Sequence, residues 1–331
     1  MGRRPLLLAA LGAAAVSTGL FLAAADVETL LAARFLFGLA TGVFTATATA
    51  ALSELVDDPA GTPRADAATV ATAANAGGLG LGALFAGIVA QEAHDPTHLV
   101  FWIYLAALLP AAVAVYVAPE TVAERRRPIL AVRRPAMPTA GGRGPFLSAA
   151  VAVFAAFAVA GLFSSLVPTF LQSDLKVTNR AVVGGEVALF FAAALAAQTA
   201  ARGRALTSRR LPGTGLALGI VSVQAGLLTR SLPVFVVGTL VSGAAFGLIL
   251  RRGVTVAHEL APPGRRADLL ATFFLCAYAG NVVPTVALGA LEQSVSSDLA
   301  TSLLAAAVLL LALTAALLRA EPAPRGREEK Q

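Results

Sequence analysis

Residues 146–171 read FLSAAVAVFAAFAVAGLFSSLVPTFL, and they indicate the class of protein to which the chain belongs. It contains no charged residue and is longer than the roughly 20 residues that one helix needs to cross a bilayer. Similar stretches recur along the 331-residue chain, which is 57% hydrophobic and 13% charged. An average soluble domain carries about 25% charged residues. The composition therefore excludes an ordinary water-soluble enzyme and predicts an all-α, polytopic membrane protein.

Working outward from this stretch, we predict ten spans joined by short breaks that are rich in turn and charged residues. The predicted spans are residues 5–25, 29–53, 66–91, 98–118, 146–171, 181–201, 211–229, 233–257, 266–291 and 298–319. The one long polar segment, 119–145, contains several arginines and prolines and is predicted to be a flexible cytoplasmic linker. The expected domains are a four-span bundle (1–118), this linker (119–145), a six-span bundle (146–320) and a disordered tail (321–331).

The positive charges fall on one side of this predicted topology. If the amino terminus is cytoplasmic, most of the 25 lysines and arginines lie inside, whereas Lys176, Arg180 and Arg230 lie outside. Cytoplasmic loops of membrane proteins are enriched in lysine and arginine. We therefore predict a multi-pass protein of the inner (plasma) membrane with both termini in the cytoplasm. The net charge of +6 is then an orientation signal and does not indicate nucleic-acid binding.

An internal repeat accompanies this pattern. Arg3-Arg4 and Arg209-Arg210 each precede four predicted spans, and each run of four closes on a glutamate next to a proline. The repetition predicts two related halves. Two further spans precede Arg210, but only three residues precede Arg4. We therefore expect a truncated or mis-started chain that lacks two helices at its beginning.

Short motifs occur in a fixed order along the chain. They are Gly2-Arg3-Arg4, Leu30-x-x-x-Arg34-x-x-x-Gly38, Gly78-x-x-x-Gly82-Ala83-x-x-Ala86-Gly87, Ala118-Pro119-Glu120-Thr121 and the arginine-rich residues 202–210. In this order they resemble the loop, fourth-helix, fifth-helix and sixth-helix motifs of the major facilitator superfamily, followed by a second loop motif. The resemblance is to its drug:proton antiporter branch, although Ala83 stands where that branch usually has proline.

The resemblance implies a secondary transporter with two helical bundles around a midplane cavity, working by alternating access and coupled to protons. The resemblance also implies efflux, and the few fixed charges in the spans favour a small hydrophobic or weakly polar solute. The expected partners are this solute, protons and the lipid bilayer. The alternative is a truncated, non-transporting remnant, or a membrane interaction protein that retains the fold.

Charged residues within or next to the spans are the first candidates for the proton and substrate pathway. The resemblance gives Arg34 a role in proton coupling or gating, but its long side chain can also reach the outer surface. Glu186 is the best candidate for a proton carrier, and the alternative is a solvated residue at the mouth of a helix. Arg251, Arg252 and Asp268 are candidates for an inner gate, although simple snorkelling also explains the arginines.

Uncharged residues supply the remaining candidates. Polar amides within spans can bind solute or form hydrogen bonds between helices, and they are Asn75, Gln198, Gln224 and Asn281. Small or helix-breaking residues can serve packing or bending, or can have no special role, and they are Gly38, Gly78, Gly82, Gly87, Pro168 and Pro284.

The sequence carries no sign of catalytic chemistry. Cys276 is the only cysteine, so neither a disulfide framework nor a cysteine-based metal site is expected. His94 and His98 have the spacing of metal ligands, but Pro96 interrupts the turn between them. No nucleophile and base are paired in a recognisable arrangement. We therefore predict no enzymatic activity, no cofactor and no metal site.

Overall fold

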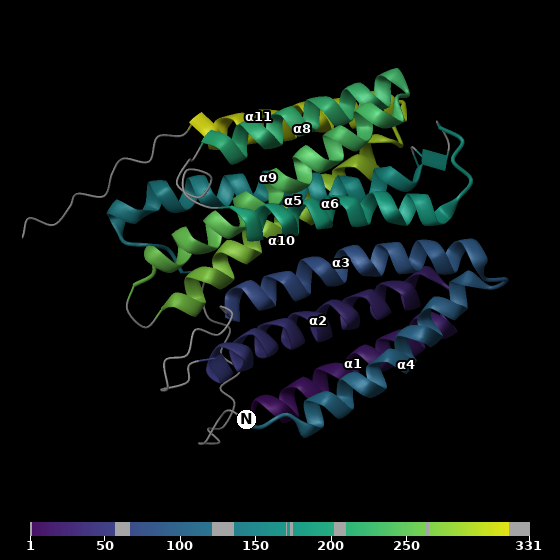
Figure 1. Ribbon diagram of the computed structural model, residues 1–331, viewed down its shortest axis with the longest axis vertical. Helices are drawn as coiled ribbons and strands as arrows, with labels where there is room; N and C mark the ends of the chain where they lie inside the picture. The colour runs from purple at the N-terminus through teal and green to yellow at the C-terminus, as the bar shows by residue number, and fades with distance from the viewer. Residues whose placement is uncertain are drawn as a thin grey trace, which may run out of the picture. The chain divides into compact units, whose positions relative to one another are not determined.

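The computed structural model describes residues 2–56, 67–120, 136–169, 171–172, 175–201, 210–262 and 265–317. In these residues the chain forms ten long α-helices and one short 3-10 turn, drawn in Figure 1. The helices are α1 (Arg3–Ala23), α2 (Val27–Val56), α3 (Ala67–Glu92), α4 (Pro96–Val117), α5 (Arg143–Thr169), α6 (Arg180–Ala200), α8 (Arg210–Thr229), α9 (Leu232–Glu259), α10 (Arg266–Leu291) and α11 (Ser297–Leu317); the turn, η1, is Ala140–Gly142.

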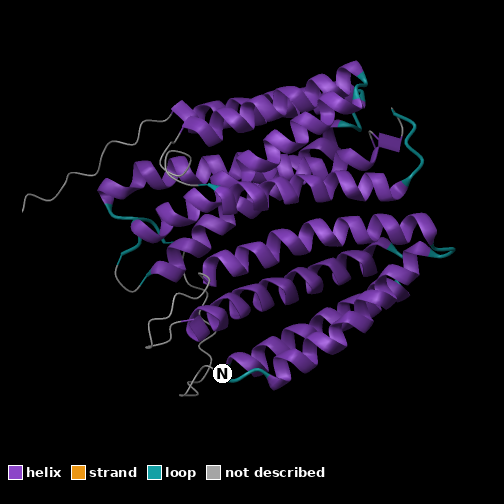
Figure 2. Cartoon of the chain, viewed as in Figure 1, coloured by secondary structure: helices purple, strands orange, loops and turns teal. Residues whose placement is uncertain are grey.

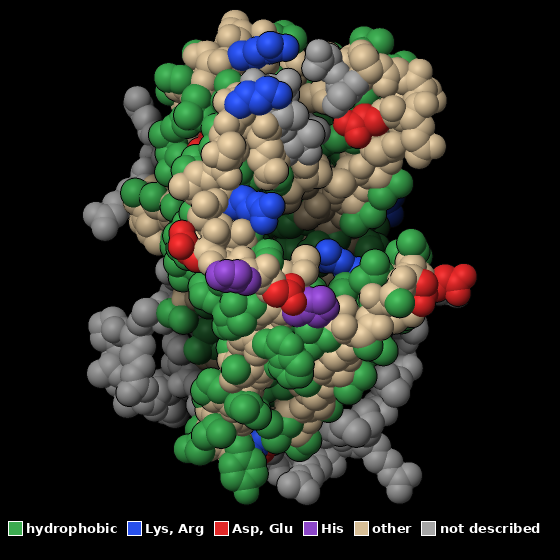
Figure 3. Space-filling view, turned by 90° about the vertical axis from the view of Figure 1, so that its right-hand side faces the viewer, with side chains coloured by type: hydrophobic (Ala, Val, Ile, Leu, Met, Phe, Trp, Pro, Cys, Tyr) green, Lys and Arg blue, Asp and Glu red, His purple; other side chains and the backbone are tan. Residues whose placement is uncertain are grey.

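The predicted all-α, multi-span class is confirmed. Over the described ranges the chain contains no strand, as Figure 2 shows. Nine of the helices there are long and apolar enough to cross a membrane, and α11 contains a shorter apolar stretch, Leu299–Thr314. Helices satisfy all their internal backbone groups, so they are the form in which such apolar segments can enter lipid. On the face drawn in Figure 3, charged side chains are sparse among hydrophobic and neutral ones.

The helix boundaries agree with the predicted spans to within a few residues. The largest difference at a helix start is in α5, which begins at Arg143 rather than at residue 146. Pro145 lies in its first turn, where a missing N–H breaks no hydrogen bond within the helix, so the proline does not delay the start. The tail 321–331 and the arginine-rich residues 202–209 lie outside the described residues.

One compact unit contains Met1–Asn75 and Phe85–Ala131. In it, α1 packs against both α2 and α4. The hydroxyl of the fully buried Ser17 on α1 donates to the carbonyl of Ala33 on α2 over 2.7 Å. The rings of Phe21 and Phe101 stack with centroids 5.2 Å apart and so join α1 to α4. Short polar and aromatic contacts therefore hold this unit together.

The start of α1 is capped by a residue that follows the end of α4. The carboxylate of Glu120 accepts hydrogen bonds from the backbone N–H groups of Arg3, over 2.7 Å, and Arg4, over 3.3 Å. The guanidinium of Arg4 lies 4.3 Å from the centroid of the Tyr116 ring. The first N–H groups of a helix have no partner within it, and a carboxylate also complements the positive end of the helix dipole. Two of the short sequence motifs thus meet in one cap.

We expect Glu120→Ala to destabilise the first unit by about 1 kcal/mol, because the free N–H groups of α1 lose their acceptor. Glu120→Gln should have a smaller effect, since its amide oxygen still accepts while the charge is lost. Chemical unfolding monitored by the fluorescence of Trp102 on α4 measures both changes. Equal stability of the alanine variant and the wild-type protein would show that the cap contributes nothing.

The second unit contains Ala76–Leu84 and Val132–Gln331. Its core lies among α5, α6, α9 and α10, and the phenylalanines there pack ring against ring. Phe190 on α6 is fully buried and its ring centroid is 4.9 Å from Phe163 on α5 and 5.5 Å from Phe246 on α9. This aromatic cluster joins α5 to α6 and α9, the two helices that carry the candidate site.

The end of the segment predicted as a flexible linker is packed on this second unit. Ala136 is buried, and its N–H donates to the hydroxyl of Thr272 on α10 over 2.9 Å. Gly142 lies against Pro138 and against Leu260, which follows α9. The part of the predicted linker from 121 to 135 lies outside the described residues. Apolar residues after the arginines explain this packing, because they bury surface on the ends of α9 and α10.

Candidate functional site

The candidate site is built on the contact between α6 and α9. Residues that differ by 53 in number face each other along both helices, at Glu186 with Thr239 and at Gln198 with Arg251. Between these two pairs, Gly243 meets the carbonyl of Phe190, and Gly247 meets that of Ala194. Steps of four residues follow one face of a helix, so the constant difference shows two parallel helices in register. We call these four pairs the α6–α9 seam.

Glu186 is buried at one end of the seam. Only 7% of the surface of Glu186 is exposed. The hydroxyl of Thr239 donates a hydrogen bond to Oε1 of Glu186 over 2.6 Å. Thr239 is itself fully buried and lies 3.1 Å from the carbonyl oxygen of Phe235, one turn earlier in α9. The structure therefore differs from the alternative of a solvated glutamate at the mouth of α6. It places a carboxyl group in an apolar bundle with a hydroxyl as its hydrogen-bond donor.

Glycines allow the close approach in the middle of the seam. A Cβ atom at Gly247 would lie 2.8 Å from the carbonyl carbon of Ala194, and one at Gly243 would lie 3.0 Å from that of Phe190. Such distances are too short for any side chain. These two glycines were not among the residues predicted from sequence, although Gly243-Ala244-Ala245-Phe246-Gly247 has the small-xxx-small spacing of close helix pairs in membranes.

Arg251 closes the other end of the seam. Its guanidinium donates to the backbone carbonyl of Gln198 and, over 3.5 Å, to that of Ala201. Carbonyls at the end of a helix have no donor within it, and they attract a positive charge. The side chain of Gln198 is buried, and within the described residues its Nε2 has no hydrogen-bond partner. Arg251 thus acts as a cap for α6.

Two of the three residues predicted to form an inner gate, Asp268 and Arg251, contact groups outside the predicted gate. Asp268, at the start of α10, accepts a hydrogen bond from Nε of Arg265 over 3.2 Å. Arg251 is directed to the end of α6. A gating role for Arg251, Arg252 and Asp268 stays a prediction.

A small apolar cavity of about 50 Å³ lies between α5, α8, α9 and α11. Its walls include Phe163, Val223, Phe235 and Ala305. Gln224 also lines it, but its Nε2 donates to the hydroxyl of Ser302 on α11 over 2.8 Å. The amide of Gln224 therefore links α8 to α11, which is one of the two roles expected for it. The volume suits a few water-sized or methyl-sized groups.

The other predicted polar residues lie in both units. In the first unit, Arg34 is exposed and its guanidinium lies 5.4 Å from the centroid of the Phe21 ring, while Asn75 is exposed. In the second unit, Asn281 lies beside Gly161, where α5 and α10 approach closely. Their roles in the proton or substrate pathway stay predictions.

The predicted packing and hinge residues differ in their surroundings. Among the residues that the structure describes, no neighbouring atom lies within 4 Å of the position that a Cβ would take at Gly38, Gly78 or Gly82. On α3 it is Gly80 that is tightly packed, since a Cβ there would lie 3.2 Å from that of Phe191. The remaining three lie within helices: Gly87 is half-buried in α3, Pro168 lies near the end of α5, and Pro284 is buried within α10. Their role as hinges stays a prediction.

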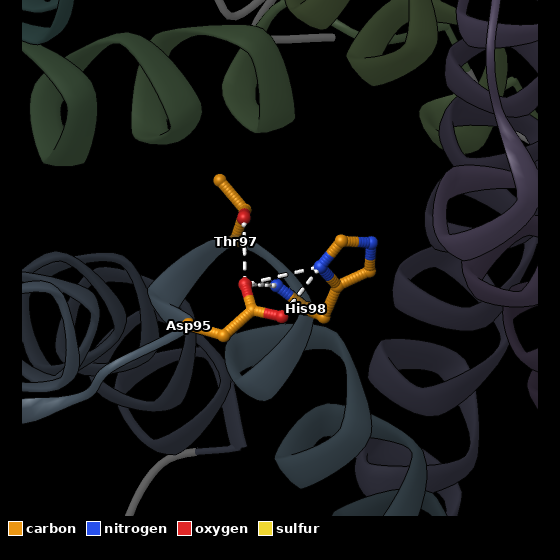
Figure 4. A network of polar contacts seen from close by, with 3 residues as sticks. All are labelled: Asp95, Thr97 and His98. Carbon is orange, nitrogen blue, oxygen red and sulfur yellow. Dashed lines mark hydrogen bonds and ion pairs between the residues drawn. The ribbon is translucent and has the colours of Figure 1, made fainter.

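The two histidines next to the α3–α4 turn are exposed. Within the described part of the chain, no group of three histidine, cysteine or acidic residues could hold a metal. Asp95 is the N-cap of α4, and Figure 4 shows its contacts. Its carboxylate accepts from the hydroxyl of Thr97 over 3.0 Å and lies 2.9 Å from Nδ1 of His98. Asp95 and His98 therefore cap the start of α4.

We expect the start of α4 to fray in acid. The hydrogen bonds with the side chains of His98 and Thr97 hold the pKa of Asp95 below its ordinary value of 3.8. A carboxyl whose pKa is lower in the folded state stabilises it fully above the ordinary value and loses this effect as the pH falls through the lowered pKa. Hydrogen exchange of the His98 amide, followed from pH 6 to pH 2, measures the change. Asp95→Asn keeps an acceptor that does not titrate, and an unaltered acid response in this variant would contradict the assignment.

Comparisons with known proteins were consistent with this architecture. A family model described as Major Facilitator Superfamily matches residues 1–211. The chain is similar in structure to the human organic anion transporter MFSD10 (TETRAN), with a TM-score of 0.67 and 16% identity over 95% of this chain and 77% of that one. It is also similar to a bacterial homologue of the human lysosomal transporter Spinster in its inward-facing, unoccupied conformation, with a TM-score of 0.61 and 18% identity over 96% of this chain and 81% of that one. At these identities the similarity establishes the fold. The comparison with curated proteins found no match.

Proposed function

Because the chain belongs to the major facilitator superfamily, a family of membrane transporters, we propose that it exchanges a small hydrophobic or weakly polar solute for protons by alternating access. The chain is a multi-span membrane transporter and not an enzyme. The proposal adds the solute class, the coupling to protons, the direction out of the cell, and a plasma-membrane location with cytoplasmic termini.

The main support for coupling to protons is the buried carboxyl group of Glu186. An ionised carboxylate costs much free energy in an apolar environment unless it is paired, whereas a neutral carboxyl needs only hydrogen-bond partners. The side chain that donates a hydrogen bond to Glu186 is the uncharged Thr239. A carboxyl group in such surroundings changes its proton occupancy readily when water reaches it, which is what a proton carrier requires.

The composition of the second unit supports the solute class. The spans of this unit consist mainly of alanine, valine, leucine, phenylalanine and glycine. Charged solutes such as sugar phosphates need basic side chains to replace their water, and the described spans offer few. One structural relative is an organic anion transporter, so an anion belongs among the compounds tested.

Purified full-length chain in proteoliposomes tests the proposal. We would load the vesicles with a pH-sensitive dye, impose a pH gradient and follow ethidium, chloramphenicol and fluorescein as hydrophobic cation, weakly polar neutral compound and organic anion. The proposal expects flux of ethidium or chloramphenicol together with proton movement of opposite direction. Solute flux without proton movement would overturn the coupling, flux of fluorescein alone would overturn the solute class, and no flux in any gradient would overturn transport of these classes.

A further inference from the structure

Thr239 has two hydrogen-bond acceptors within reach of a single hydroxyl hydrogen. Its Oγ1 lies 2.6 Å from Oε1 of Glu186 and 3.1 Å from the carbonyl oxygen of Phe235. A threonine hydroxyl donates one hydrogen bond and has lone pairs that can accept others. The hydroxyl can therefore donate to only one of these oxygens at a time.

The two protonation states of Glu186 select different partners. The ionised carboxylate can only accept, so the hydroxyl of Thr239 donates to it in a charge-assisted hydrogen bond. The neutral carboxyl can instead donate its own proton to Oγ1 of Thr239, and the hydroxyl hydrogen then turns to the carbonyl of Phe235. A threonine commonly donates to the carbonyl four residues earlier in a helix. The proton that Glu186 gains is transferred from a hydronium ion in the surrounding water, so one hydronium O–H bond breaks as the carboxyl O–H bond forms and a water molecule is left. No other covalent bond changes.

We propose that Thr239 is a positioning residue that holds Glu186 across the α6–α9 seam in both protonation states and sets the pH at which Glu186 exchanges its proton. This inference concerns the same site as the proposed function. It rests on that function only for the claim that the proton of Glu186 drives solute transport. In each state the carboxyl and the hydroxyl have partners, so neither is left buried without a hydrogen bond. The seam therefore stays closed at this end while the proton is gained or lost.

The charged residues nearest to Glu186 and Thr239 along the chain lie more than one helical turn away, and they include Arg230 in the turn between α8 and α9, nine positions before Thr239. On α9, the first charged residue after Thr239 is Arg251, twelve positions and therefore about 18 Å further along the axis. On α6, Arg180 precedes Glu186 by six positions, about 9 Å. Residues 76–84 contain no titratable group. The others on the packed elements are Arg143 at the start of α5, Arg210 at the start of α8, Arg252, His258 and Glu259 beyond Arg251 on α9, and Arg266, Asp268, Cys276 and Tyr278 on α10.

Removing the hydroxyl should favour the neutral form of Glu186. The ionised form loses the hydroxyl that donates to it, and a hydrogen bond to a charged group is the stronger of the two that Thr239 can make. The proton should therefore be held to higher pH in Thr239→Val, by about one to two pH units. Thr239→Ser keeps the hydroxyl and should retain the wild-type midpoint.

The experiment follows the carboxyl C=O stretch of the full-length protein in lipid by infrared difference spectroscopy between pH 4 and pH 10. The band of Glu186 is identified by its loss in Glu186→Gln. The measurement follows protonation alone and therefore needs no solute. Thr239→Val and Thr239→Ser are compared with the wild type, and Thr239→Ala replaces the valine variant if that fails to fold. Arg251→Gln is the control, because it weakens the far end of the seam and should leave the midpoint unchanged.

An upward shift in Thr239→Val, absent in Thr239→Ser and Arg251→Gln, supports the inference. Three outcomes overturn it: an unshifted midpoint in Thr239→Val, an equal shift in Thr239→Ser, or no Glu186 band that titrates. The proposed function is tested separately, since a shifted band in a protein that moves no protons with solute would refute the coupling and leave the positioning role of Thr239 intact.

Discussion

Replacing Glu186 with glutamine is expected to abolish accumulation driven by a pH gradient. Glutamine has nearly the same shape and can still accept the hydrogen bond from Thr239, so the bundle should fold, but an amide carries no proton at these pH values. With one proton exchanged per neutral solute, a gradient of one pH unit sustains about a tenfold solute gradient. In Glu186→Gln that ratio should fall to about one. Chloramphenicol uptake into proteoliposomes under an imposed pH gradient measures it.

Exchange of labelled for unlabelled chloramphenicol without a pH gradient should persist in this variant, because that step needs no net proton transfer. Glu92→Gln is the matched control, since it neutralises an exposed carboxylate at the end of α3. It should accumulate solute as the wild type does. If Glu186→Gln also accumulates chloramphenicol tenfold per pH unit, Glu186 is not the proton carrier.

Replacing Gly247 with leucine should destabilise the second unit. Even a Cβ at this position would lie within 3 Å of the backbone of Ala194, and backbone atoms cannot turn aside as a side chain does. The two helices must separate, and this opens the contacts on either side of the seam. Overpacking of this kind costs about 1–3 kcal/mol. Chemical unfolding in detergent micelles, monitored by circular dichroism, measures the change.

Gly289→Leu provides the comparison for this prediction. Gly289 lies on α10 and is exposed, and no described residue comes within 4 Å of the position that a Cβ would take there. Its replacement should alter stability by less than about 0.5 kcal/mol. Similar stabilities of the two leucine variants would show that the seam is not closely packed in the protein.

The membrane spans could be predicted from sequence because their cause is local. A long apolar segment has to form a helix in lipid, and charges or prolines mark its ends. The predicted span 266–291 coincides with α10 for this reason. Linkers are harder, because the packing of Ala136 against Thr272 depends on residues far apart in the chain. No local pattern around Ala136 indicates this contact.

The candidate site was predictable only in part. Glu186 is conspicuous because a carboxyl group in an apolar span is costly, but Thr239 is not, because threonines are common in such helices. Its pairing depends on which faces of α6 and α9 meet, and that is a tertiary property. The same argument explains why the glycines of the seam were not predicted for close helix packing. Gly78 and Gly82 stand out because glycines cluster in the sequence of α3, whereas Gly243 and Gly247 are distinguished by lying against a neighbouring helix.

The constant difference of 53 between paired residues constrains how this protein can vary in length. One residue added to α6 between Glu186 and Gln198 would turn everything beyond it by about 100° around the helix axis. Either Glu186 or Gln198 would then face away from α9. A residue would also have to be added to α9, between Thr239 and Arg251, to restore both contacts. Insertions in the chain between α6 and α9 leave the match untouched, because they change the offset without rotating either surface.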